Sequence, residues 1–171
     1  DWSSDVCSSD LLMVAVLFGA QLALCLNNLF ETGWDVAGIV SSTRDLANGG
    51  PLQHDYFSMY PNNLMSVYLY GAVSLLLKAT GLWETIGFPV DIAAFSVLNC
   101  ILSSATGVLL WHCARRLARS RGAADAVWLL YAVLIGLSPW LIVPYSDSLS
   151  LPFPTLMLFI SLRPFRRGWT R

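Results

Sequence analysis

Two aspartates and one polar, aromatic stretch are the residues of this sequence whose types could carry chemistry. Asp35 follows the first apolar segment in ETGWDVAGIV, and Asp147 lies in VPYSDSLSL between two later apolar segments. The stretch HDYFSMYPNN, from His54 to Asn63, lies between them in the sequence. A carboxylate can accept a proton as a general base or bind a hard cation through its oxygens. These residues are therefore the first candidates for a functional site.

The composition places these candidates in a membrane protein. The 171 residues are 56% hydrophobic and 12% charged, and the mean hydropathy is +0.59. A soluble domain has about 25% charged residues. Cys25, Cys100 and Cys113 lie in apolar runs without CxxC spacing, so the sequence does not indicate a zinc site. It also has no nucleotide-phosphate loop, and nucleic acid is not an expected partner.

Four apolar segments could cross a bilayer, whose hydrocarbon core takes roughly 20 helical residues. They cover residues of about 11–28, 90–113, 123–143 and 146–162, and Ser138-Pro139 breaks the third near its end. The fold class that these segments predict is all-α. We expect a polytopic transmembrane helix bundle with a long first extracytoplasmic loop.

That long loop carries two further expected helices. Residues 35–47 place Val36, Ile39 and Val40 close to one face, as a membrane-surface helix would, and NGGP ends the pattern. Residues 62–80 follow a proline that suits a helix start, and they are apolar but somewhat short for a span. We expect this second helix to lie in the outer interface or to dip into it.

Charge is sorted along the sequence as in membrane proteins of fixed orientation. Most acids fall between the first expected span and the start of the next. The arginines form two clusters: Arg115, Arg116, Arg119 and Arg121, then Arg163, Arg166, Arg167 and Arg171. Because basic residues collect on the cytoplasmic side, we expect both clusters there and residues 29–89 outside. If residues 62–80 crossed the bilayer, the acidic loop before them would also lie inside.

Both ends of the sequence are expected to be incomplete. Residues 1–10, DWSSDVCSSD, are polar and low in complexity, and they resemble a translated sequencing adapter. We treat them as a non-native segment. The sequence stops directly after the second arginine cluster. Residues 11–171 are therefore interpreted as the N-terminal part of one longer transmembrane domain, a fragment expected to be inactive alone.

An ordered set of motifs resembles the N-terminal third of GT-C glycosyltransferases. These are polytopic membrane enzymes that include the protein O-mannosyltransferases and the aminoarabinose transferases of lipid A. The motifs are ETGWDVAGIV, SSTRDLANGG, YFSMYPNN, a helix ending in ARRLARSRG, one ending in SPW, and VPYSDSLSL. They extend over residues 11 to 163, and their order carries the resemblance.

The resemblance implies an activity and a role for each candidate residue. Family members take a sugar from a polyprenyl-phosphate-linked donor on the extracytoplasmic side, so the expected partners are that lipid and the bilayer, here the bacterial cytoplasmic membrane. Asp35 and Asp147 match acids at the catalytic or metal site, where oxygen ligands would favour Mg²⁺ or Mn²⁺. Tyr60 stands where many relatives have a Lys. The expected substrate-binding residues are His54, Tyr56, Tyr60, Asn62, Asn63, Arg44 and Lys78.

Other interpretations of these residues stay open. Asp35 could cap the helix that follows it, and Asp147 could be an ordinary turn residue. The tyrosines of HDYFSMYPNN could be interface anchors, and its asparagines could cap the next helix. A transporter or flippase is the alternative function, in which Asp91 and Asp125 would carry coupling ions. A non-catalytic membrane scaffold is a third.

Overall fold

The computed structural model describes residues 8–85 and 89–162, and within these ranges every regular element is helical. The all-α class is therefore confirmed. The elements are α1 (Ser8–Asn27), α2 (Trp34–Ala47), α3 (His54–Met59), η1 (Pro61–Asn63), α4 (Leu64–Ala79), α5 (Leu82–Thr85), α6 (Val90–Ala118), α7 (Arg121–Tyr131), η2 (Ala132–Gly136), η3 (Pro139–Leu141), α8 (Ser146–Ser150) and α9 (Pro152–Ser161).

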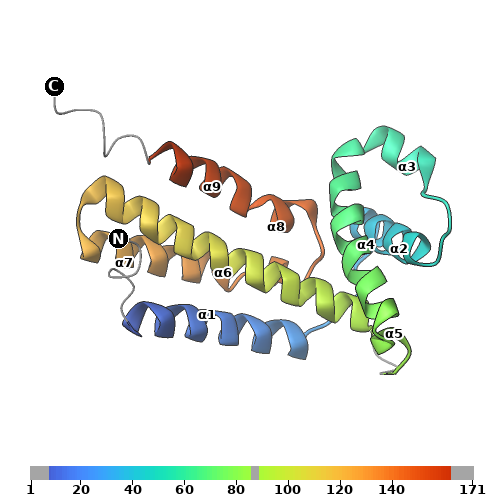
Figure 1. Ribbon diagram of the computed structural model, residues 1–171, viewed down its shortest axis with the longest axis horizontal. Helices are drawn as coiled ribbons and strands as arrows, with labels where there is room; N and C mark the ends of the chain where they lie inside the picture. Colours follow the sequence, from blue (N-terminus) through green and yellow to red (C-terminus); the bar gives the residue numbers. More distant parts are fainter. Residues whose placement is uncertain (1–7, 86–88, 163–171) are drawn as a thin grey trace.

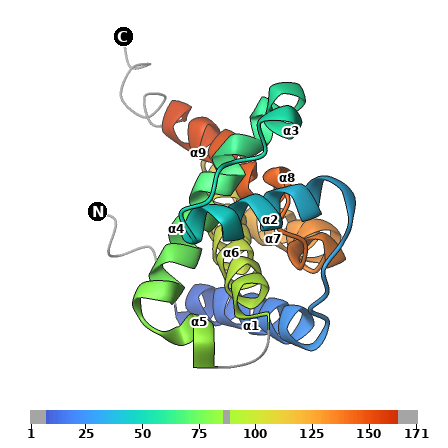
Figure 2. The same cartoon turned by 90° about the vertical axis from the view of Figure 1, so that its right-hand side faces the viewer.

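The longest helices form a bundle along the long axis of the molecule (Figure 1). α6 lies at its centre and packs against α1, α7 and α9. The helices α2, α3, α4 and α5 gather at one end of this bundle, and we call them the end cap. Figure 2 looks along α6 and shows α2 and α4 lying across its end. The region expected as a long loop is thus a folded layer.

α6 is the helix in the described ranges that is both long and apolar enough to cross a membrane. Its 29 residues would reach about 43 Å at 1.5 Å per residue, which exceeds a hydrocarbon core of about 30 Å. α1 contains a shorter apolar stretch, Leu11–Asn27. Of the four expected spans, α6 alone meets both criteria within residues 8–85 and 89–162.

The last two expected spans are interrupted helices. The segment expected over residues 123–143 consists of α7, a π-helical turn (η2) and the short η3, which begins at Pro139. The segment expected over residues 146–162 is divided into α8 and α9, and Pro152 begins α9. Proline has no N–H to continue a helical hydrogen-bond ladder. The break expected at Ser138-Pro139 in the third segment is present, and the fourth expected helix is divided into shorter pieces that need other hydrogen-bond partners.

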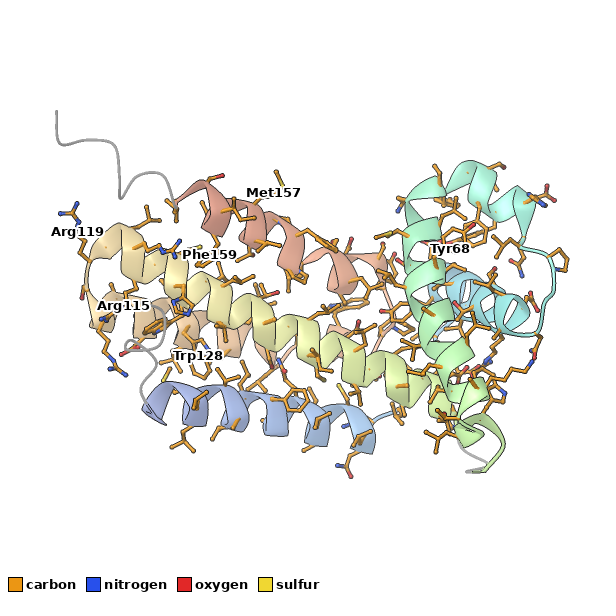
Figure 3. The ribbon with its side chains drawn as sticks, in the orientation of Figure 1. Tyr68, Arg115, Arg119, Trp128, Met157 and Phe159 are labelled. Atoms are coloured by element: carbon orange, nitrogen blue, oxygen red, sulfur yellow. The ribbon has the colours of Figure 1, made fainter. Side chains whose placement is uncertain are left out.

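Apolar side chains cover the outside of the bundle, and polar side chains are buried inside it. Leu12, Leu134 and Met157 are 63%, 70% and 70% exposed, and Figure 3 shows Met157 pointing away from the bundle. Gln21 and Asn99 are 0% exposed. A large exposed apolar surface around an interior that contains hydrogen-bonded polar side chains fits lipid better than water as the surrounding medium. The packing therefore agrees with the membrane character that the composition indicates.

One buried network holds the backbone that follows η3. Asn99 Nδ2 of α6 donates to the carbonyl oxygens of Leu141 and Val143, at 3.1 and 3.3 Å. Tyr70 Oη of α4 donates to Asn99 Oδ1 at 2.8 Å. Backbone that leaves a helix inside an apolar environment must find such partners. Asn99 thereby joins the bundle, the end cap and the irregular segment at a single side chain.

A second buried network joins α1 to α6 and to the π-helical turn. Gln21 Nε2 donates to the carbonyl oxygen of Gly136 at 2.8 Å and to Ser103 Oγ at 3.1 Å. Ser104 Oγ donates to Gln21 Oε1 at 2.8 Å. Both the amide nitrogen and the amide oxygen of Gln21 are thus hydrogen-bonded. The polar side chain stabilises the bundle because its alternative would be an unpaired amide in an apolar interior.

Arg44 fastens the end cap to α6. Its Nε lies 2.6 Å from Asp91 Oδ2, and its Nη2 lies 2.6 Å from Glu31 Oε1. The side chain of Asp91 is 5% exposed, whereas that of Glu31 is 54% exposed. The hydrogen bond to Asp91 is the largest cause that raises the pKa of Arg44, so the guanidinium stays charged beside the buried carboxylate. A buried carboxylate without such a partner would be strongly destabilising.

The first arginine cluster lies at the opposite end of α6 from Asp91. Figure 3 shows Arg115 and Arg119 at the end of α6 that is remote from the end cap. Asp91 is at the other end of α6, where it meets the end cap. The second arginine cluster, in residues 163–171, lies outside the described residues, as do residues 1–7 of the segment interpreted as non-native. α1 begins at Ser8, inside that segment.

The substitution Asn99→Ala should lower the free energy of unfolding by about 2–4 kcal/mol, because it leaves the buried carbonyl group of Leu141 and the hydroxyl of Tyr70 without partners. Unfolding in mixed detergent micelles, followed by tryptophan fluorescence, measures this. Asn27→Ala is the matched control, since Asn27 bonds within its own helix at an exposed position. Equal losses for the two variants would contradict the role of Asn99.

The substitution Arg44→Met should cost about 3–5 kcal/mol, because it leaves the buried Asp91 carboxylate unpaired. Glu31→Gln should cost less than about 1 kcal/mol, since that ion pair is exposed. The double variant Arg44→Met/Asp91→Asn should be more stable than Arg44→Met alone. A double-mutant cycle measures this coupling, and simple additivity of the two changes would contradict it.

Candidate functional site

Asp35 lies in the first turn of α2, where the chain enters the end cap. Gly33 is the N-cap residue of α2, so the capping interpretation of Asp35 is wrong. A carboxylate in the first turn is stabilised by the positive end of the helix dipole. Trp34 before it has φ +60° and a 97% exposed side chain. The exposed indole and the half-buried carboxylate therefore stand next to each other at the edge of the end cap.

Tyr145 connects Asp35 with the segment that contains Asp147. Tyr145 Oη donates to Asp35 Oδ2 at 3.4 Å, across 110 residues of sequence. This distance is longer than the usual 2.7–2.8 Å of an O–H···O bond, so it is a weak contact that leaves the carboxylate able to accept other bonds. Asp147 lies two residues further on, at the start of α8, and is exposed. The two predicted acids thus come from segments that meet at Tyr145.

The stretch HDYFSMYPNN contacts the backbone of Asp35 through Tyr56. Tyr56 Oη donates to the backbone carbonyl oxygen of Asp35 at 3.4 Å, and Asn63 Nδ2 donates to Tyr56 Oη at 2.7 Å. Asn62 Nδ2 donates to Asn63 Oδ1 at 3.2 Å. The ring of Tyr56 can lie against α2 because Gly38 has no side chain; a Cβ there would come within 3.3 Å of the ring. A chain of side-chain hydrogen bonds therefore runs from Asn62 to the turn that carries Asp35.

The phenols beside Asp35 keep their protons at neutral pH. Burial is the largest cause that raises the pKa of Tyr56, to about 12, and the negative charge of Asp35 adds to the shift. Loss of solvent is also the largest cause that raises the pKa of Tyr145, and the charges of Asp35 and Asp147 add to it. Both phenols are thus donors at physiological pH.

Most of the other candidate residues of HDYFSMYPNN lie near Tyr56. Tyr60 stacks on Tyr56, with ring centroids 5.3 Å apart. Asn63 is the N-cap residue of α4, but its side chain makes no cap hydrogen bond and turns to Tyr56 instead. His54 is exposed at the start of α3 and is not part of this chain of hydrogen bonds. Four of the seven expected binding residues, Tyr56, Tyr60, Asn62 and Asn63, are therefore grouped beside Asp35.

The two basic candidates lie elsewhere in the end cap. Arg44 is at the other end of α2 from Asp35 and is held by Asp91 and Glu31. Lys78 Nζ donates to the carbonyl oxygen of Ala47 and to Asn48 Oδ1, at 3.1 and 2.9 Å, so it caps the C-terminal end of α2. Both cations have a structural role in these contacts. Their contact with a substrate phosphate stays a prediction.

The carboxylates near Tyr145 could bind a cation only with additional ligands. Within residues 8–85 and 89–162, no three His, Cys, Asp or Glu side chains lie together as a metal site would need. Mg²⁺ is often bound by one or two carboxylates together with substrate phosphates and water. Asp35 and Asp147 fit that smaller set, so their role as metal ligands stays a prediction.

Tyr145 is the residue of this site that was not singled out from the sequence. It belongs to the same short segment as Asp147, PYSDS, and a tyrosine next to a candidate acid in an interfacial segment is the signal that could have found it. Its contact with Asp35 could not be found, because the two residues are 110 positions apart. The packing of the Tyr56 ring against Gly38 is also a contact between residues that are not neighbours in the sequence.

Comparison with known proteins bears on the class of molecule. Residues 3–167 match the family described as conserved hypothetical integral membrane protein. No curated protein matches the chain, and no solved structure matches it. The family match covers nearly the whole sequence and agrees with the apolar outer surface of the bundle and with the length of α6. The chain therefore belongs to this family of integral membrane proteins.

Proposed function

We propose that this chain belongs to a GT-C-type glycosyltransferase that moves a sugar from a polyprenyl-phosphate donor to a hydroxyl acceptor. The reaction takes place on the extracytoplasmic side of a bacterial cytoplasmic membrane. The observation that carries the proposal is the contact of Tyr145 with Asp35, which brings the segments of the two predicted acids to one edge of the end cap. That edge lies at the end of the bundle remote from Arg115 and Arg119 (Figure 3).

The proposed reaction is a direct displacement at the anomeric carbon. The acceptor hydroxyl oxygen attacks this carbon while a carboxylate oxygen of Asp35 accepts the hydroxyl proton. The bond from the carbon to the donor phosphate oxygen breaks, and the electron pair leaves with the polyprenyl phosphate. Tyr145 and Tyr56 hold the turn that carries Asp35, and Asn62 and Asn63 offer amide groups for sugar hydroxyls. Asp147 orients the acceptor, and its carboxylate together with that of Asp35 would hold a divalent cation.

The placement of the end cap supports a lipid-linked donor. α2 and α4 lie across the end of α6, as helices at a membrane surface would (Figure 2). Trp34 and Trp140 are 97% and 67% exposed. Indole rings favour the headgroup region of a bilayer. A donor with its tail in the bilayer would present its phosphate and sugar at this level. The leaving phosphate needs positive charge, which a Mg²⁺ or Mn²⁺ ion at the acids would supply.

The contacts of the intramembrane acids favour this proposal over the transporter or flippase. Asp91 is paired with Arg44, and Asp125 accepts a hydrogen bond from Trp111 Nε1 at 2.8 Å and lies 3.8 Å from Arg121. An acid that carries a coupling ion must release its partner in each cycle, whereas these acids hold helices together. The carbonyl groups of the interrupted helix are likewise bound by α6 side chains, not left open for an ion.

The substitution Asp35→Asn should lower sugar transfer by about 10²–10⁴-fold, because it removes the general base. Membranes that contain the full-length protein are incubated with radiolabelled polyprenyl-phosphate hexose or pentose, and label that leaves the lipid fraction is counted. Asp55→Asn, at an exposed acid of α3, is the control and should keep full activity. Binding of polyprenyl phosphate, measured by native mass spectrometry, should be the same in both variants. Full transfer by Asp35→Asn would falsify the assignment of the base.

The substitution Tyr145→Phe should lower kcat by about 3–30-fold with little change in KM. It removes the hydroxyl that positions Asp35, and a misplaced catalytic group costs rate even when binding is intact. Tyr68→Phe, at a half-exposed ring on α4, is the control (Figure 3). The thermal midpoint of Tyr145→Phe should stay within about 2 °C of the unmodified protein. A loss of kcat that follows a loss of stability would instead mean a structural role alone.

A further inference from the structure

Two thiols from distant parts of the sequence meet inside the bundle. Cys25 Sγ of α1 and Cys100 Sγ of α6 are 3.5 Å apart, and both residues are 0% exposed. They pack with Leu141 and Ile142, which belong to the irregular segment after η2. Both cysteines are free in the structure. A pair of thiols in direct contact differs from an isolated buried cysteine, because each sulfur has a reaction partner already in place.

We propose that Cys25 and Cys100 are a redox modification site, at which an intramolecular disulfide joins α1 to α6. A disulfide has an S–S length of about 2.05 Å, so the sulfurs must approach by about 1.5 Å from their present contact. Rotation about the side-chain bonds of two cysteines on packed helices can supply much of such a shift. The proposal does not depend on the glycosyltransferase function.

The oxidant class that the site admits is a small, neutral peroxide. Cys25 lies near the end of α1 and its side chain is fully buried, as is that of Cys100, so an oxidant must be small and uncharged to diffuse to the pair between packed apolar side chains. The Cys25 sulfur attacks the O–O bond of hydrogen peroxide, which gives a sulfenic acid and one water. The Cys100 sulfur then attacks the Cys25 sulfur, forms the S–S bond and releases a second water. Two thiols and one peroxide thus give one disulfide and two waters.

The disulfide would restrain the segment that leads to the candidate site. Ser96 Oγ donates to the carbonyl oxygen of Ile142 at 3.1 Å, and Asn99 binds the backbone on either side of it. Asn99 is the neighbour of Cys100 on α6. A covalent link at Cys100 therefore fixes α1 and α6 around residues 141–143. Two positions later, Tyr145 contacts Asp35.

The test counts free thiols in the intact chain, which has four cysteines. The protein in liposomes is treated with hydrogen peroxide, denatured without reductant and reacted with a polyethylene-glycol maleimide, which adds one gel shift for each free thiol. We expect four shifts to fall to two, and dithiothreitol to restore four. Cys113→Ser is the control and should fall from three shifts to one. Cys25→Ser and Cys100→Ser should each keep three.

Further measurements keep the test valid if a serine disturbs the packing. Peptide mass spectrometry of the oxidised, unsubstituted protein should find a linked peptide that contains Cys25 and Cys100. Hydrogen exchange of amides in residues 137–145 should slow by about threefold or more in the oxidised protein. Four free thiols after peroxide, a loss not reversed by dithiothreitol, or a linked peptide with Cys7 or Cys113 would overturn the pairing. Unchanged exchange would overturn the restraint.

Discussion

Peptide groups that leave a regular helix in an apolar environment must be hydrogen-bonded by something else, and here side chains of α6 meet that need. The chain is irregular from η2 to α8, where a π-helical turn and two prolines interrupt the helical ladder. Ser96 and Asn99 bind the carbonyl groups of residues 141–143. Without them, the carbonyl groups of Leu141 and Ile142 would lack these partners, at a cost of about 1–3 kcal/mol each, whereas that of Val143 would keep the N–H of Tyr145.

The candidate site depends on the same constraint. Tyr145 reaches Asp35 because the backbone just before it is fixed to α6. The other half of the site is fixed by the end cap, in which Arg44 binds Asp91 and the ring of Tyr56 lies on Gly38. Both halves thus rest on the N-terminal part of α6, the first on Asn99 and the second on Asp91. The hydrogen bonds of Tyr145 and Tyr56 to Asp35 are long, whereas the backbone before Tyr145 and the end cap are firmly fixed. A ligand could therefore replace these two hydrogen bonds without unfolding either half.

Local sequence signals were sufficient for α2 and α4 of the end cap, whereas α3 and α5 were not expected. The NGGP sequence marks the end of α2, which is at Ala47, and Pro61 precedes α4, which begins at Leu64. These signals act within a few residues, so they can be interpreted without knowing the fold. The same holds for the start of α6 at Val90.

The contacts that build the site could not be predicted, because they join distant positions. Tyr145 and Asp35 are 110 residues apart, and Arg44 and Asp91 are 47 apart. Arg44 has the same charge whether it binds a phosphate or a buried carboxylate, and only the packing distinguishes the two. The broken third segment was visible as Ser138-Pro139, but the side chains that make the break tolerable lie on α6.

The hydrogen bond from Gln21 to Gly136 has a consequence for how the protein is made. It joins positions 115 residues apart. At a synthesis rate of about 5–20 residues per second, the Gln21 amide waits roughly 6–23 s after its own synthesis before its carbonyl partner exists. Its other partners, Ser103 and Ser104, are also missing until α6 has been made. The first helix of the bundle is therefore the one that stays longest without its final neighbours. The machinery that inserts the chain must shield the polar Gln21 side chain until the segment that contains Gly136 has been made.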